Sequence, residues 1–147
     1  MSISEQDYAE ILARRAAKKG SRPVRPISFT VPGVPVAKPR QTRSDKWKKR
    51  PCVLRYREWA DKARQAMYDA TGTVSMIGGQ LDVIAYFPTR SGWRSPGSVH
   101  KLKPDADNIL KAVSDAICRN EDQMIHDMSV KKRWDDGNGP RVEITIL

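Results

Sequence analysis

Residues 103–111 read Lys-Pro-Asp-Ala-Asp-Asn-Ile-Leu-Lys, and this stretch sets the architecture that we expect for the chain. Pro104 and Asp105 are residue types that commonly begin a helix, and an apolar stripe follows them at helical spacing. The stripe consists of Ile109, Leu110, Val113, Ala116 and Ile117. The stretch therefore predicts an amphipathic helix of about eleven residues with two carboxylates at its start.

Asp105 and Asp107 lie where free backbone N–H groups and the helix dipole favour negative charge. Their carboxylates should stay ionised at neutral pH and be available to a divalent cation. A simple helix cap is the alternative, because aspartate at a helix start most often serves only that purpose. Lys111, one turn after Asp107, is either a partner of that carboxylate or a cation directed at a phosphate.

A second acidic pair, Glu121-Asp122, follows the predicted helix. If the chain from Cys118 is extended, it covers about the length of the helix in reverse, so Asp122 could just return to the helix start. Three carboxylates at one point repel one another unless a cation lies among them. Oxygen ligands favour Mg²⁺ or Mn²⁺ over zinc. We therefore expect Asp105, Asp107 and Asp122 to form a metal site.

The composition favours a polyanion as partner. The chain has 147 residues, a length typical of one domain, and 27 basic against 17 acidic residues give a net charge of +10. Nucleic acid is preferred over membrane, because no apolar run reaches the length of a spanning helix. We see no secretory signal at the N-terminus, and Cys52 and Cys118 lack metal-type spacing. We therefore expect reduced thiols in a cytoplasmic protein.

Two basic, irregular stretches are candidates for phosphate contacts. The longer one covers residues 38–50 and carries Trp47, which could stack on an unpaired base, and the shorter one covers residues 89–100. A solvated charged surface is the alternative. The basic residues that we expect to contact nucleic acid are Lys38, Arg40, Arg43, Lys46, Lys48, Lys49, Arg50, Arg94 and Lys103.

Apolar periodicity predicts an α+β fold, with two main helices on a mixed sheet of about four strands. The second helix is expected over residues 54–70, closed by Gly72, and a hairpin turn over Asp-Gly-Asn-Gly at 136–139. The strands are expected over residues 27–31, 80–87, 128–134 and 141–147.

Residues 1–22 are expected to be a basic arm, and residues 23–147 to be the folded domain. Ser4 could cap a short helix with Tyr8, Ile11 and Leu12 on one side. The arm either lies on nucleic acid or a partner subunit, or is a partly ordered tail.

The stretch from Pro104 to Ala116, followed by an acidic pair and a strand with Lys-Lys-Arg, resembles the RusA family of Holliday junction resolvases. Residues 31–40 and Tyr-Arg-Glu-Trp at 56–59 resemble that family as well, and the match runs from about residue 27 to the C-terminus. The resemblance implies a RusA-like fold and a Mg²⁺-dependent endonuclease. It also implies a homodimer that cuts branched, four-way DNA in recombination and repair, often encoded by phages or prophages.

Carried over by motif, Asp105 and Asp107 match the first two catalytic acids of the family, and Lys111 matches the lysine. Asp122 matches the third acid, although the segment before it is a few residues shorter than in the family pattern. Glu121 or Asp127 could therefore take its place. In the mechanism that this implies, the three acids hold one or two Mg²⁺ that acidify a water and polarise a phosphate.

Two other classes remain open on the sequence alone. One is a non-catalytic nucleic-acid-binding protein whose acids are helix caps, and the other is a nuclease that prefers flaps or single strands. His100 and His126 lack partners at metal-ligand spacing, so we interpret both as structural or DNA-facing residues.

Overall fold

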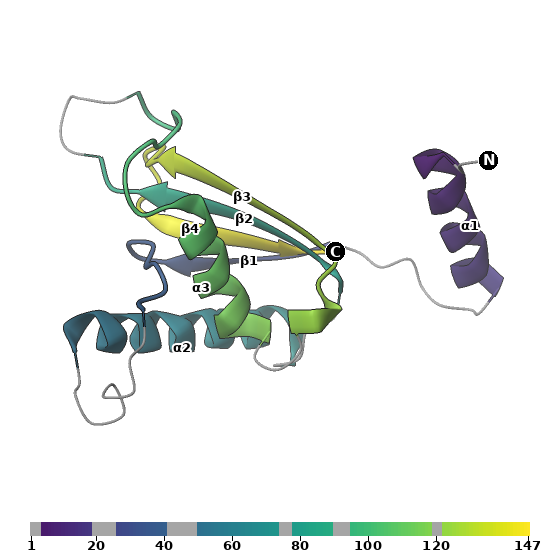
Figure 1. Cartoon of the computed structure of the whole chain (residues 1–147), viewed down its shortest axis with the longest axis horizontal. Helices are drawn as coiled ribbons and strands as arrows, with labels where there is room; N and C mark the ends of the chain where they lie inside the picture. The colour runs from purple at the N-terminus through teal and green to yellow at the C-terminus, as the bar shows by residue number, and fades with distance from the viewer. Residues whose placement is uncertain (1–3, 19–25, 41–49, 74–77, 90–94, 119–121) are drawn as a thin grey trace.

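The computed structural model describes residues 4–18, 26–40, 50–73, 78–89, 95–118 and 122–147. Its helices are α1 (Glu5–Lys18), α2 (Pro51–Thr71), α3 (Ala106–Cys118) and the short 3₁₀ helix η2 (Asp122–Met124). Its strands are β1 (Ile27–Pro32), β2 (Gln80–Phe87), β3 (Asp127–Trp134) and β4 (Arg141–Ile146). The α2 and α3 helices pack on one mixed sheet (Figure 1), so the predicted α+β class is confirmed.

The sheet has the order β1-β4-β2-β3. β4 is antiparallel to both of its neighbours, whereas β2 and β3 are parallel and are joined by α3. A helix in such a crossover runs back along the sheet, so its first turn lies at the carboxyl ends of the two strands. The geometry of the crossover therefore places residues 105–111 at that edge of the sheet.

The connection between β3 and β4 has the predicted turn but not the predicted hairpin pairing. The carboxylate of Asp135 accepts hydrogen bonds from the N–H groups of Gly137 (3.0 Å) and Gly139 (2.9 Å), as turn chemistry requires. β2, however, lies between β3 and β4, so these two strands do not pair. The hairpin prediction is wrong because the parallel crossover through α3 places β3 on the far side of β2.

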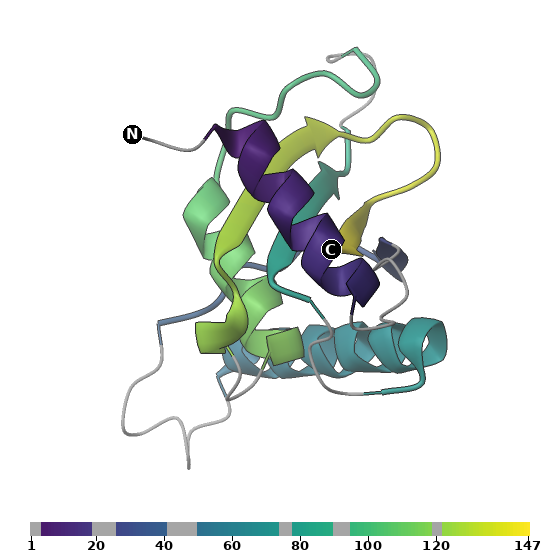
Figure 2. The same ribbon diagram turned by 90° about the vertical axis from the view of Figure 1, so that its right-hand side faces the viewer.

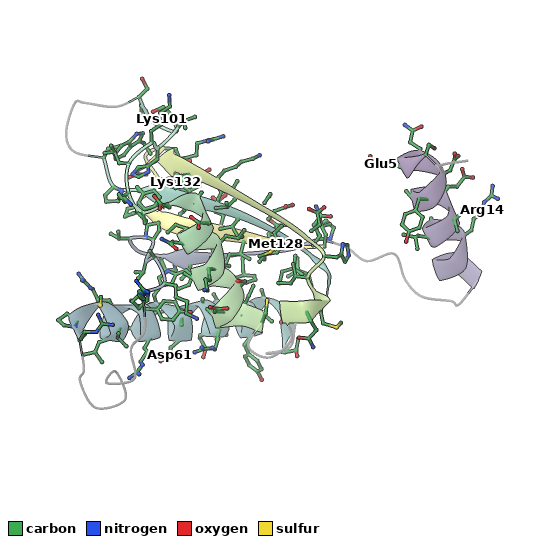
Figure 3. All side chains as sticks on the ribbon, in the orientation of Figure 1. Glu5, Arg14, Asp61, Lys101, Met128 and Lys132 are labelled. Carbon is green, nitrogen blue, oxygen red and sulfur yellow. The ribbon has the colours of Figure 1, made fainter. Side chains whose placement is uncertain are left out.

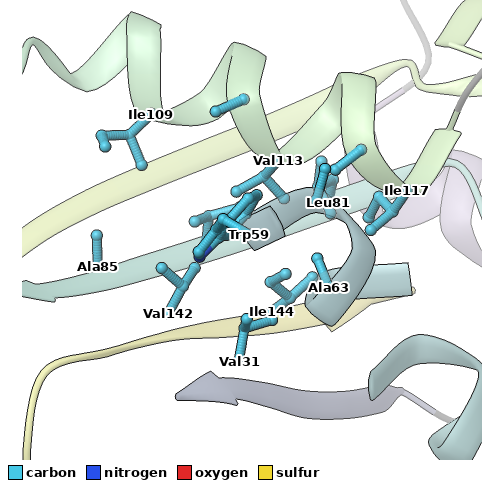
Figure 4. Packing of buried hydrophobic residues seen from close by; sticks show 14 of the residues in the cluster. Val31, Trp59, Ala63, Leu81, Ala85, Ile109, Val113, Ile117, Val142 and Ile144 are labelled. Atoms are coloured by element: carbon cyan, nitrogen blue, oxygen red, sulfur yellow. The ribbon is translucent and has the colours of Figure 1, made fainter. Parts of the chain in front are cut away.

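Alternating side chains of the strands form the core with the inner faces of α2 and α3. In β2 and β4 every second residue is buried, and Trp59 of α2 lies between these strands and α3 (Figure 4). The largest fully buried side chains from the helices include Met67, Ile109, Val113 and Ile117. The apolar stripe predicted for α3 is thus the surface that fixes this helix on the sheet.

The ends of α2 follow local chemistry. The helix begins at Pro51, three residues before the predicted start, because proline lacks the N–H that a first helical turn leaves unpaired. Gly72 ends it with a φ of 73°, and its N–H donates to the carbonyl of Tyr68 at 2.7 Å. None of the described helices is both long enough and apolar enough to cross a membrane.

The predicted N-terminal helix is confirmed as α1. The hydroxyl of Ser4 accepts a hydrogen bond from the N–H of Asp7 at 3.2 Å, so Ser4 caps the helix. Tyr8, Ile11 and Leu12 are exposed, and α1 stands apart from the two layers (Figure 1). The division into an arm and a domain stays a prediction.

An ion-pair cluster joins the β3–β4 turn to the open face of the sheet. The guanidinium of Arg141 donates to both carboxylate oxygens of Asp136 and to one oxygen of Glu143, each at 2.9 Å. It also lies 3.9 Å from the ring centre of Tyr86. The hydrogen bonds from Arg141 lower the pKa of Asp136 to about 2.

Asp136→Asn should lower the melting temperature at pH 7, because it removes a charge-assisted pair with two parallel hydrogen bonds. Since folding lowers the pKa of Asp136 from 3.8, the pair stabilises the fold above that pH, and the stabilisation is lost as the pH falls toward about 2. Thermal unfolding between pH 7 and pH 2 should therefore show the difference from wild type shrinking. Asp127→Asn, at an exposed position of β3, is the control, and a pH-independent difference would contradict the assignment.

Candidate active site

The segment before α3 is built onto the outer edge of β3. The N–H of Trp134 donates to the carbonyl of Ser98 at 2.8 Å, and the N–H of His100 donates to that of Lys132 at 3.1 Å. The His100 ring is buried; it stacks on Phe87, with 4.0 Å between ring centres, and lies tilted against Trp134 at 4.4 Å. This packing supports the interpretation of His100 as a structural residue.

Asp105 and Asp107 lie together at the start of α3. The carbonyl of Asp105 accepts the hydrogen bond from Ile109 N–H at 3.2 Å, and Asp107 is exposed in the first turn. The carboxylate of Asp105 is 3.6 Å from the ammonium of Lys103, and both side chains are mostly exposed. Such an exposed pair contributes little stability, so the carboxylate is accessible to a stronger cation.

A basic pocket lies against the first two turns of α3, beginning at Asn108, the residue after Asp107. Its volume is about 570 Å³, and its lining combines the segment before α2 with the first two turns of α3. The residues that line it are Lys38, Pro39, Arg40, Asn108 and Lys111. Three of the five carry a positive charge, so the pocket is suited to a phosphate group.

Contacts with α3 hold the segment at residues 38–40 in place. The ammonium of Lys38 forms an ion pair with Asp115 and lies 5.9 Å from the ring centre of Tyr56. The backbone N–H of Lys38 donates to the carbonyl of Asn108 at 3.4 Å. Burial and the charge of Asp115 raise the pKa of Tyr56 to about 12, so its hydroxyl stays a donor to the carbonyl of Ala112. Lys38 thus anchors this side of the pocket.

Asp122 does not lie beside the other two acids in the same chain. It begins η2, which follows the C-terminal end of α3 (Figures 1 and 2), whereas Asp105 and Asp107 are at the N-terminal end. A helix of 13 residues is about 20 Å long. Within the described ranges, no three His, Cys, Asp or Glu side chains gather as a metal-binding group. After η2 the chain enters β3, and it is this strand that runs back toward the start of α3.

Lys132 is the residue that returns to the start of α3. Its ammonium donates to the carbonyls of Leu102 and Pro104, and Figure 3 shows it, like Lys101, at the end of the sheet where α3 begins. The sequence contained a signal for this role. Lys132 alternates with apolar residues at positions that face the core, where a charged side chain needs a partner.

The remaining predicted residues divide into two groups. The guanidinium of Arg50 donates to the carbonyl of Arg40 at 2.7 Å, which joins the start of α2 to the pocket segment. Lys103 is at the mouth of α3, as described above. The residues that lie outside the described ranges are Arg43, Lys46, Lys48, Lys49, Arg94 and Glu121.

Compared with known protein families, residues 32–147 match the family described as Endodeoxyribonuclease RusA. No curated protein matches the chain. The family match covers the end of β1 and everything after it, so it contains every residue of the candidate site. It leaves α1 outside.

Arg40→Ala should weaken binding to DNA by a similar factor for every sequence, because we expect this pocket to contact phosphates and not bases. The slope of log affinity against log salt should become shallower by about one. Affinity measured in EDTA from 50 to 300 mM salt checks this. Lys62→Ala, which removes a cation that pairs with Glu58 on α2, is the control, and equal slopes for all three proteins would contradict the pocket's role.

Proposed function

The chain belongs to the RusA family of endodeoxyribonucleases, and from this premise we propose that it cuts four-way DNA junctions by paired hydrolysis of phosphodiester bonds. The observation that carries the proposal is the basic pocket against the first two turns of α3, the helix at whose start Asp105 and Asp107 lie. Acidic ligands next to cations are what hydrolysis of a polyanion needs, whereas a purely binding surface gains nothing from carboxylates near the phosphates. A net charge of +10 fits the same substrate.

The donor set at the start of α3 fits Mg²⁺, with Mn²⁺ as a substitute. Asp105 and Asp107 offer carboxylate oxygens, and Mg²⁺ typically takes one or two carboxylates together with waters and substrate phosphates. The nearby histidine, His100, is buried between aromatic rings and so does not compete as a ligand. When bound there, Mg²⁺ would stabilise negative charge on the phosphate and acidify a water molecule.

The basic residues around these carboxylates have separate roles in this proposal. Lys111 is one turn from Asp107 and lines the pocket, so it stabilises charge that develops on the phosphate under attack. Arg40 binds a neighbouring phosphate and sets the register of the strand. Lys103, just before α3, attracts the DNA phosphate backbone toward Asp105.

The third acid comes from a second copy of the chain in this proposal. Asp122 and Asp107 are separated by most of the length of α3, so one chain cannot bring both to one ion without unfolding that helix. A homodimer that places η2 of one copy against the start of α3 of the other would complete the set. Two such sites would also provide the paired cuts that resolution of a four-way junction requires.

The enzyme would act in DNA recombination and repair in the cytoplasm of a bacterial host, encoded by a phage or prophage. Flap or single-strand cleavage is the competing activity, because the same carboxylates would serve either substrate.

Asp107→Asn should bind a synthetic four-way junction as wild type does but cleave it at least about a hundredfold more slowly, because it removes an anionic ligand without changing side-chain size. The measurement is cleavage of an end-labelled junction with and without Mg²⁺, beside a gel-shift assay. Asp61→Asn, an exposed aspartate on α2, is the matched control.

Wild-type cleavage by Asp107→Asn would show that the site is elsewhere. Flap, single-stranded and linear duplex substrates belong in the same assay. If a flap is cut faster than the four-way junction, flap cleavage and not junction resolution is the activity of this site.

Mixing two inactive variants should restore cutting. In a heterodimer of Asp107→Asn with Asp122→Asn, a shared site of the proposed kind leaves one of the two sites with every acid intact. Heterodimers isolated with two affinity tags should therefore nick one strand of the junction, while each variant homodimer does not. If the heterodimer binds DNA but is as inactive as the homodimers, the third acid does not come from a second copy.

A further inference from the structure

We propose that Lys132 is a positioning residue that holds the Asp105 carboxylate in its metal-binding position. The inference rests on the proposed function, because it assigns a role toward the site at the start of α3. Lys132 itself touches neither the substrate nor the carboxylate in this proposal. It acts through the backbone of residues 102–104.

The contacts of Lys132 are made entirely with the loop that leads into α3. Its ammonium donates to the carbonyl of Leu102 at 2.6 Å and to that of Pro104 at 2.7 Å. These distances are at the short end for such bonds, as expected when the donor is charged. One side chain thus holds two carbonyls that are two residues apart in the loop, from a strand about 30 residues later in sequence.

Asp105 is fixed from both sides by this arrangement. The Pro104 carbonyl belongs to the peptide that enters Asp105, so holding it sets the orientation of that peptide plane. The carbonyl of Asp105 itself accepts a hydrogen bond from Ile109 within α3. Among the described residues, the carboxylate of Asp105 pairs with Lys103, and this exposed ion pair is too weak to orient it. The backbone on either side therefore determines where the carboxylate points.

The position of Lys132 in the sheet shows why a lysine serves here. It pairs in register with Ala85 and faces the side of the sheet that α3 covers, between Val130 and the buried Trp134. A long flexible stem can cross this apolar surface and bring the ammonium to the carbonyls at its rim. Lys131, the residue before it on the strand, is exposed on the opposite face. The same strand thus supplies a matched control.

Lys132→Met keeps an unbranched apolar side chain and removes the ammonium that donates the hydrogen bonds. Lys131→Met is its control. In the metal-free protein, amide hydrogen exchange of residues 101–109 should be faster in Lys132→Met and unchanged in Lys131→Met. Binding of Mn²⁺, followed by the electron paramagnetic resonance signal of the free ion, should weaken about tenfold in Lys132→Met alone. The half-saturating Mg²⁺ concentration for junction cleavage should rise by the same factor, with junction affinity in EDTA unchanged.

Wild-type exchange and wild-type Mn²⁺ affinity in Lys132→Met would overturn the inference, as would equal effects of the two methionine variants. Lys132→Gln, a polar side chain at a half-buried edge position, takes the place of Lys132→Met if that variant does not fold, with the same expected direction. Because exchange is measured without metal or DNA, its outcome is separate from the proposed function. If the wild-type protein does not cut the junction, the proposed function is rejected. The hydrogen-exchange comparison still tests whether Lys132 holds residues 102–104.

Discussion

The packing of the apolar face of α3 onto β2 and β3 is the constraint on which the rest of the molecule depends. It fixes a parallel crossover, and a parallel crossover must place the first turn of the helix at the carboxyl ends of its strands. Polar residues in that turn are therefore presented to solvent at a sheet edge, on a rigid base. Asp105 and Asp107 owe their position to the buried residues behind them, above all Ile109 and Val113.

Around this edge the chain balances opposite charges. Each acid at the start of α3 has a basic neighbour within a few residues, and the pocket beside them is lined by cations. Much of this basic charge is committed to the fold, because Lys38 pairs with Asp115 and Lys132 holds two carbonyls. The cations thus divide into those that hold the fold together and those, such as Arg40 and Lys111, that line the pocket.

Local sequence patterns predicted the helices and strands well, whereas the pairing of strands distant in sequence could not be predicted. Alternation in β2 and the stripe of α3 were visible in the sequence because each depends on a few neighbouring residues. The false hairpin before Arg141 and the position of Asp122 both depend on which strands lie side by side, and the sequence around them carries no such information. The start of α3 was predicted as a site, whereas the partners of Lys132 and Asp115 could be identified only in the tertiary fold.

The strand order has a consequence for how the protein is made. β4 is the last described strand to leave the ribosome, yet it lies between β1 and β2 and hydrogen-bonds to both. Until residues 141–146 emerge, β1 is a single unpaired strand, and the β2–β3 pair has an open edge on the side that β4 later fills. The four-stranded sheet, and with it the core that α2 and α3 cover, is thus completed only after translation has passed β4.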